Sequence, residues 1–349
     1  MNQKRRLSTF DLVKGICMLS VVGCHFDESL FRKINFTFNL PAFFLIGGYF
    51  YSVNSGRLKG RSIRLLKPYL FTVLLIAAVD TMKVPAGALL LGYDIPILQT
   101  MRERLSYWLL AGVYGSGLRH DFFSYSLPYV GAIWFLLAYI WNMVFMELTC
   151  AHTGRLQAHQ KRNVLIGVSI ALFVVGWWTA KYTWLPLSIQ AACCSFFLFA
   201  VGFVLKPFIP DLLHSRKAIA LCGLIWTVQL THSIIRGHMD MVQCYYPLFL
   251  LELIGASAGD LVLLSGGDVW ERSGKFIRLR HFFEWIGRNT LPFLCFHLVE
   301  MSIVPWQRLS AFGLPDVVEK TLIFNLKVVW GVFWIYAVNH FKPLKKIFS

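Results

Sequence analysis

Apolar runs of about twenty residues recur from one end of the sequence to the other, and they constrain the fold more than any other feature. Helices of about 20 residues cross a bilayer, and in lipid only helices and closed barrels satisfy their own backbone hydrogen bonds. The chain is 56% hydrophobic and only 15% charged, far from the balance of a soluble domain. We therefore predict an all-α polytopic membrane protein, with residues 1–349 forming a single integral-membrane domain. About ten transmembrane helices are expected, at residues 8–27, 36–53, 69–91, 129–150, 164–181, 187–205, 218–235, 243–265, 283–300 and 321–341.

Most lysines and arginines fall in short clusters between these runs, although the net charge is +16. A nucleic-acid-binding surface needs a basic stripe interleaved with exposed aromatic residues, which the sequence does not show, so no nucleic-acid partner is expected. Cytoplasmic loops of polytopic proteins are enriched in lysine and arginine. Both termini are therefore predicted to be cytoplasmic in a multi-pass protein of the inner (plasma) membrane, together with the loops 57–67, 151–163, 206–217 and 270–281. The mixed segment 93–128 predicts an external helix at the membrane interface.

The first apolar run, FDLVKGICMLSVVGCHF, carries three ionisable groups that are costly at membrane depth. Lys14 and His25 are eleven residues apart, about three helical turns, so they project from nearly one stripe that also includes Asp11. Two interpretations are open. Asp11 and Lys14 form an i,i+3 pair at the interface while His25 marks the outer boundary. Alternatively the stripe carries chemistry, since a histidine titrates near neutrality and can take a proton from a hydroxyl.

A second pattern follows in FNLPAFFLIGGYF, residues 38–50, where paired glycines let another helix approach closely. In the basic stretch after it, Arg61 and Arg64 are one helical turn apart. They can hold a phosphorylated ligand, because guanidinium groups bind phosphate oxygens bidentately. Anchoring to anionic lipid explains a basic loop equally well. Further on, Asp80 and Lys83 are expected to neutralise each other at i,i+3.

Together these segments resemble the acyltransferase 3 family, membrane enzymes that O-acylate cell-surface carbohydrates, and in particular its fucose 4-O-acetylase-like members. Two departures from the family pattern stand out. Lys14 stands where arginine is common, which keeps the charge and loses the bidentate fork. Gly47 stands where serine more often precedes a glycine, so this segment is expected to serve helix packing. The resemblance rests on FDLVKG with its histidine, LPAFFLIGGYF, RSIRLLKPY, IWFLLAYIW and WIGRNTLPFLCFH, in this order along nearly the whole chain.

The resemblance implies an enzyme that transfers an acyl group, with acetyl as the expected one, from acyl-CoA to a hydroxyl of a cell-surface or exported carbohydrate. It implies His25, Lys14 and Asp11 as catalytic residues, and Arg61 and Arg64 as the residues that bind CoA. Acyl-CoA is then a substrate, so no permanently bound cofactor and no metal is expected. The other expected partners are a carbohydrate or glycolipid acceptor and membrane lipid.

Polar groups within later apolar runs are candidates for binding substrate. Glu252 lies near the centre of the eighth predicted helix, and Asn289 and His297 belong to the last motif. A transporter or flippase of lipid-linked sugar is the alternative function, because many helices and central charges would serve it equally. Transporters often show paired halves, which this sequence lacks, and the ordered motifs favour the enzyme.

Overall fold

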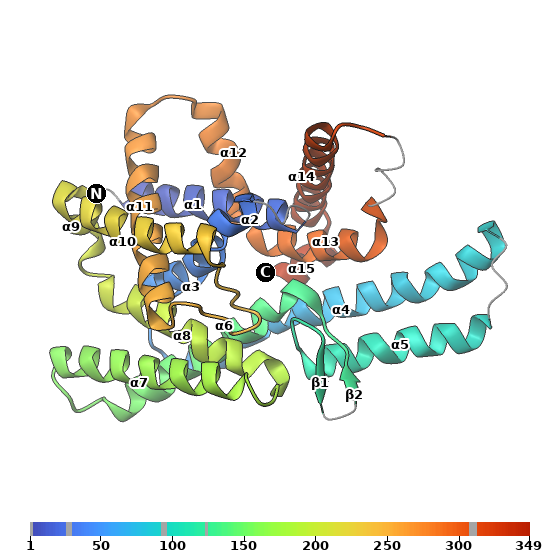
Figure 1. The fold of residues 1–349 in the computed structure, drawn as a ribbon, viewed down its shortest axis with the longest axis horizontal. Helices are drawn as coiled ribbons and strands as arrows, with labels where there is room; N and C mark the ends of the chain where they lie inside the picture. Colours follow the sequence, from blue (N-terminus) through green and yellow to red (C-terminus); the bar gives the residue numbers. More distant parts are fainter. Residues whose placement is uncertain (1–2, 26–29, 92–95, 123–124, 307–312) are drawn as a thin grey trace. The chain divides into compact units, whose positions relative to one another are not determined.

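The computed structural model describes residues 3–25, 30–91, 96–122, 125–306 and 313–349. Within these ranges most of the chain is helical, and its named strands are the two short ones of an antiparallel hairpin, which confirms the predicted all-α class (Figure 1). Among the helices that the structure describes, seven are long and apolar enough to cross a membrane. The chain divides into two compact units, each described by itself. Unit 1 is Met1–Leu58, Trp141–Tyr182 and Gln190–Thr290, and unit 2 is Lys59–Ile140, Thr183–Ile189 and Leu291–Ser349.

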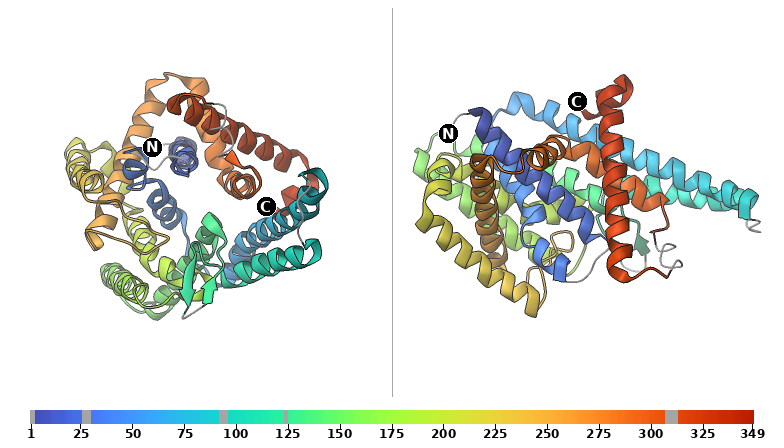
Figure 2. Two further views of the ribbon diagram at one scale, coloured as in Figure 1. Left: turned by 45° about the vertical axis from the view of Figure 1, so that its right-hand side comes forward. Right: turned by 90° about the horizontal axis from the view of Figure 1, so that it is seen from above.

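Unit 1 is organised around α1 (Gln3–Cys24), which packs against four other helices of the unit: α2, α3, α11 and α12. Its core joins Phe10 and Cys17 of α1 to Tyr49 of α3 and to Leu261 and Leu264 of α11. The dark blue α1 lies beside the orange α12 in both views of Figure 2. The other helices of unit 1 are α2 (Leu30–Asn35), α3 (Asn39–Phe50), most of α6 (Trp134–His152), α7 (Ala158–Thr179), nearly all of α8 (Ile189–Leu205), α9 (Ile209–His214), α10 (Arg216–Ile235), α11 (Leu250–Ser273) and α12 (Ile277–Arg288).

Unit 2 contains an antiparallel pair of long helices, α4 and α5, which run side by side in Figure 2. The Tyr69 hydroxyl of α4 donates to the carbonyl of Gly112 in α5 over 2.7 Å, which ties the two helices near one end. The elements of unit 2 are most of α4 (Ser55–Leu91), α5 (Ile97–Tyr114), β1 (His120–Phe122), β2 (Tyr125–Leu127), the short 3-10 helices Gly131–Ile133 and Pro186–Ser188, the first part of α6, nearly all of α13 (Thr290–Ile303), α14 (Asp316–His340) and α15 (Lys342–Phe348).

The prediction that residues 57–67 form a loop is wrong, because these residues form the first turns of α4. At 37 residues α4 is about 55 Å long, whereas a bilayer core is about 30 Å thick, so the helix continues well beyond its apolar part. Pro68 and Pro85 lie inside it. The Thr72 hydroxyl donates to the Pro68 carbonyl over 2.7 Å, so this carbonyl has a side-chain partner near the proline.

Three other predicted helices also differ from the structure. The run 36–53 yields only the 12-residue α3, and the run 283–300 is divided between α12 and α13. The run 243–265 begins as an irregular segment, so α11 starts at Leu250. Residues 26 and 27 of the first predicted helix lie outside the described residues. The count of ten spans and the cytoplasmic termini stay predictions.

Candidate active site

The ionisable groups of the first helix lie in unit 1. Lys14 Nζ is 2.7 Å from Asp11 Oδ1, and both side chains are half-buried, so the i,i+3 pair expected from the spacing is present. α1 ends at Cys24, and His25 follows it, with its backbone N–H 3.3 Å from the carbonyl oxygen of Val22. The His25 side chain is partly exposed.

Two glycines allow α1 and α12 to touch backbone to backbone. A Cβ atom on Gly15 would lie 2.0 Å from the carbonyl oxygen of Phe283, and one on Gly287 would lie 1.7 Å from the carbonyl oxygen of Asp11. No Cβ atom fits at such distances, so only glycine permits this reciprocal crossing. The crossing brings the first family-like motif against the last one. It holds the pair of Asp11 and Lys14 on a helix that is fixed to its neighbour.

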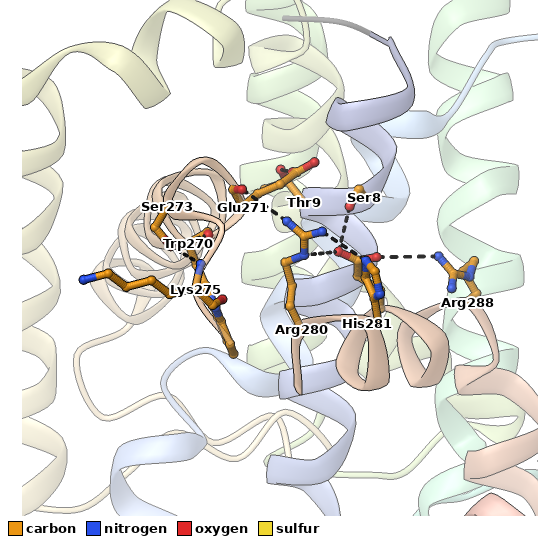
Figure 3. A network of polar contacts seen from close by, with 10 residues as sticks. Ser8, Thr9, Trp270, Glu271, Ser273, Lys275, Arg280, His281 and Arg288 are labelled. Atoms are coloured by element: carbon orange, nitrogen blue, oxygen red, sulfur yellow. Dashed lines mark hydrogen bonds and ion pairs between the residues drawn. The ribbon is translucent and has the colours of Figure 1, made fainter. Parts of the chain in front are cut away.

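A network of polar side chains fastens the beginning of α1 to α11 and α12 (Figure 3). The Glu284 carboxylate is buried and accepts a hydrogen bond from the Ser8 hydroxyl over 2.8 Å. Arg280 Nε lies 3.0 Å from the same carboxylate, one turn away on α12. The Thr9 hydroxyl donates to Glu271 at the end of α11 over 2.7 Å. These contacts fix the position of α1 along its axis.

A second network holds the other end of α1, next to His25. The Ser20 hydroxyl donates to Asn35 of α2 over 2.6 Å, and the Asn39 amide of α3 donates to Ser20 over 3.3 Å. Arg32 Nε lies 3.2 Å from the carbonyl oxygen of Cys24, the last residue of α1. A cation at a helix C-terminus is stabilising because it faces the negative end of the helix dipole. Both ends of the helix that carries the proposed catalytic stripe are therefore anchored.

Glu252 lies in the first turn of α11. The prediction that it lies near the centre of a transmembrane helix is therefore wrong. Its fully buried carboxylate accepts a hydrogen bond from Gln229 Nε2 over 2.9 Å and one from the backbone N–H of Leu248 over 3.3 Å. His232 Nδ1 lies 3.7 Å away. In this structure Glu252 thus joins α10 to α11.

Asn289 lies between α12 and α13, where it ends α12. Its backbone N–H bonds the carbonyl of Ile286 over 2.8 Å, and its side-chain amide donates to the carbonyl of Trp285 over 2.7 Å. An asparagine that satisfies helix-end carbonyls breaks the predicted continuous helix at this point.

Unit 1 also contains a buried acid that the sequence analysis missed. Asp260 of α11 is almost fully buried, and neither carboxylate oxygen has a hydrogen-bond partner among the residues described. It lies near enough to the Cys17 thiol of α1 to act on it electrostatically. Its signal was a single aspartate in the apolar segment GASAGDLVLL, which is by default a functional candidate in a membrane helix.

The predicted CoA-binding arginines lie in unit 2, in the first turns of α4. Arg64 is exposed, and Arg61 is half-buried and close enough to Tyr139 of α6 for its charge to act on the phenol. Tyr139 belongs to the IWFLLAYIW motif, so the structure brings two family-like motifs together here. A half-buried guanidinium and an exposed one a turn away can both contact phosphate oxygens.

The predicted ion pair of Asp80 and Lys83 is present, but Asp80 has a closer partner on another helix. Asp80 Oδ1 is 2.9 Å from Arg104 of α5 and 3.8 Å from Lys83, and the Asp80 carboxylate also accepts a hydrogen bond from Trp108 over 3.1 Å. Lys83 donates to the carbonyl of Ser302. The carboxylate therefore joins α4 to α5, because a partner from another helix approaches it more closely than its neighbour in sequence.

His297 lies on α13 in unit 2, fully buried among ionisable groups. Its Nδ1 is 3.4 Å from Glu300 Oε1, and the same oxygen is 2.5 Å from Nζ of Lys327 on α14. Sequence analysis singled out His297 and missed the other two, although each is an isolated charge in an apolar run.

These features define a multi-pass membrane protein with ionisable side chains fixed inside its helical units. The profile of the acyltransferase 3 family, described as an acyltransferase domain, matches residues 7–339, and the chain belongs to this family of membrane acyltransferases. Searches of curated proteins and of solved structures return no match to the chain.

Proposed function

We propose that this membrane acyltransferase moves an acyl group, expected to be acetyl, from acyl-CoA to a hydroxyl of a cell-surface or exported carbohydrate in the inner (plasma) membrane. The observation that carries the proposal is the anchored first helix. It presents the ion pair of Asp11 and Lys14 along its length and His25 just beyond its end. The reciprocal crossing at Gly15 and Gly287 joins two motifs of the family at this helix.

In the proposed reaction His25 is the general base. An alcohol is too weak an acid to attack without one, and a neutral imidazole can take its proton near pH 7. The hydroxyl oxygen then bonds to the thioester carbonyl carbon, the carbon–sulfur bond breaks, and CoA leaves as a thiolate. The proton on His25 passes to solvent, from which the thiolate recovers one. Lys14 and His25 are eleven residues apart, which is about 16 Å along a helix, so Lys14 cannot act on the same atoms as His25. We therefore assign Lys14 and its partner Asp11 to the donor end of the stripe.

The donor is proposed to bind through Arg61 and Arg64, whose guanidinium groups suit the phosphates of CoA. Their position before the apolar part of α4 fits a water-soluble donor. For substrate binding the candidates remain His297, Asn289 and Glu252. The expected partners are acyl-CoA, a carbohydrate or glycolipid acceptor and membrane lipid.

The proposal is tested by comparing the surface glycan of cells with and without the gene, using mass spectrometry for O-linked acyl groups. Loss of an O-acyl group in the deletion strain, restored by the wild-type gene and not by His25→Ala, would support it. The matched control is His340→Ala, since His340 is an exposed histidine that bonds a carbonyl of its own helix. An unchanged O-acyl content with accumulation of lipid-linked precursor would instead indicate a flippase.

A further inference from the structure

Unit 2 contains three ionisable side chains that are buried together at the contact of α13 and α14. His297 and Glu300 are fully buried on α13, and Lys327 of α14 is only 2% exposed. Moving a charged group from water into the protein interior costs roughly several kcal/mol per ion, even after the surroundings relax. Apolar side chains of similar volume often stabilise the folded protein as well as a buried ion pair does. Stability alone therefore does not explain why these residues are charged.

One carboxylate oxygen connects all three groups. Glu300 Oε1 lies 2.5 Å from Lys327 Nζ and 3.4 Å from His297 Nδ1. The spacing of three residues on α13 places His297 and Glu300 on the same side of the helix. The ammonium group of Lys327 also lies 4.9 Å from the centre of the Trp306 ring. The same oxygen of Glu300 thus lies next to a cation and an imidazole.

The surrounding contacts fix this arrangement. The rings of Phe296 and Trp334 stack at 4.0 Å with their planes 3° apart, and Trp330 Nε1 donates to the carbonyl of Phe296 over 2.8 Å. Gly331 allows the Phe293 ring to approach α14, because a Cβ atom there would lie 2.4 Å from it. These contacts join α13 and α14 on one side of the charged groups, and they keep Lys327 opposite Glu300.

The carboxylate determines which imidazole nitrogen is basic. Lys327 supplies the positive charge that Glu300 requires, so the imidazole beside it need not be charged. A neutral imidazole with Nδ1 facing a carboxylate carries its proton on Nδ1, which makes Nε2 the acceptor. The same orienting role of a carboxylate is found in hydrolase triads and behind metal-binding histidines.

We propose that Glu300 and Lys327 are positioning residues that hold His297 as the Nδ1–H tautomer, so that Nε2 accepts a hydrogen bond from a substrate N–H or O–H group. This inference rests on the proposed acyl transfer. Two sources share the required chemistry: the amide N–H groups of the pantetheine arm of acyl-CoA, and a hydroxyl of the acceptor. Loss of the contact would raise the KM of whichever substrate supplies the donor.

The decisive experiment exchanges the two charges. In the double variant Glu300→Lys with Lys327→Glu the buried ion pair remains, and an ammonium group replaces the carboxylate beside Nδ1. A second double variant, Glu300→Leu with Lys327→Leu, removes both charges. Each protein is purified into nanodiscs and assayed for acyl transfer with a soluble oligosaccharide acceptor, and its melting temperature is measured.

We expect both double variants to melt close to the wild type and to lose about 10- to 100-fold in kcat/KM, as when the carboxylate partner of an oriented histidine is removed. A higher KM for acyl-CoA would identify the donor amide as the hydrogen-bonding group, and a higher KM for the acceptor would identify the hydroxyl. Wild-type kinetics in the charge-exchanged protein would overturn the inference and leave a structural ion pair.

A second pair of variants keeps the inference testable if the double variants do not fold. His297→Gln places an amide near the Nε2 position, and His297→Asn places one near Nδ1, and neither alters the ion pair. We expect His297→Gln to retain more activity than His297→Asn, and equal activities would contradict the role of Nε2. If the wild-type protein itself transfers no acyl group from acyl-CoA, the proposed function fails and these comparisons do not arise.

Discussion

Substituting the two glycines at the crossing of α1 and α12 tests how the proposed active-site helix is held. In Gly15→Ala the new methyl group would lie 2.0 Å from the carbonyl oxygen of Phe283, and in Gly287→Ala it would lie 1.7 Å from that of Asp11. An ordinary contact begins at 3.4 Å, so the helices would have to separate by about 1.4 Å and 1.7 Å respectively. Neither obstacle is a flexible side chain. Overpacking of this kind costs about 1 to 3 kcal/mol, and the backbone contact favours the upper end of that range.

The matched control is Gly266→Ala on α11, where a Cβ atom meets no other atom within 4 Å. That change should stabilise the helix by about 0.5 to 1 kcal/mol, because alanine is the better helix former. The crossing variants should therefore lower the stability of the protein, whereas the control should raise it. The double variant at the crossing should cost less than the two single variants together, since one separation of the helices accommodates both methyl groups.

The assay is thermal unfolding in detergent followed by tryptophan fluorescence, with acyl transfer measured on the same samples. We expect both crossing variants to melt below the wild type and to lose transfer activity, because α1 carries Lys14 and leads to His25. If Gly15→Ala melted and turned over like Gly266→Ala, α1 and α12 would not be in backbone contact and the account of the anchored helix would be refuted.

Three further predictions concern single groups. His25→Ala should lower turnover about 10²- to 10⁴-fold, as the loss of a general base does, while acyl-CoA affinity by calorimetry stays near wild type; an unchanged turnover would exclude the base role. Arg61→Ala and Arg64→Ala should each weaken acyl-CoA binding by about 1.5 to 3 kcal/mol. Arg57→Ala, which changes an exposed arginine of the same helix, should leave acyl-CoA binding unchanged. If all three variants bound acyl-CoA equally well, Arg61 and Arg64 would be lipid anchors only. Glu147→Leu should destabilise the protein by about 1 to 3 kcal/mol, because it removes the buried oxygen that accepts 2.7 Å hydrogen bonds from the Tyr51 hydroxyl and the backbone of Asn54. A wild-type melting temperature would contradict this.

Local spacing predicted what is determined within one helix. Asp11 and Lys14 are one turn apart, and their ion pair is present at 2.7 Å. For Asp80 the same reasoning named Lys83, and Arg104 from another helix approaches more closely. Sequence spacing limits which neighbours are near, whereas the partner is chosen by the packing of helices far apart in the sequence.

The same limit explains what was missed at the candidate site. Both glycine motifs were recognised, yet nothing in the sequence showed that Gly15 and Gly287 lie in one crossing. Glu300 and Lys327 are 27 residues apart and on different helices, so no periodicity connects them. The charge of the stretch 57–67 predicts a loop, but lysine, arginine and leucine are good helix formers and extend α4 out of its apolar part.

The ion pair between Lys327 and Glu300 also bears on how the protein is inserted during its synthesis. A lysine at the middle of an apolar helix adds about 2.5 to 3.5 kcal/mol to the free energy of releasing that helix from the translocon into lipid. Glu300 precedes Lys327 along the chain, so α13 leaves the ribosome first and its carboxylate is in place when α14 arrives. Whether α14 inserts into the membrane then depends on α13 as well as on the hydropathy of α14. A nascent chain carrying Glu300→Leu would deliver α14 to the translocon with a buried cation that has lost its counter-ion, and a fraction of the molecules would fail to integrate this helix.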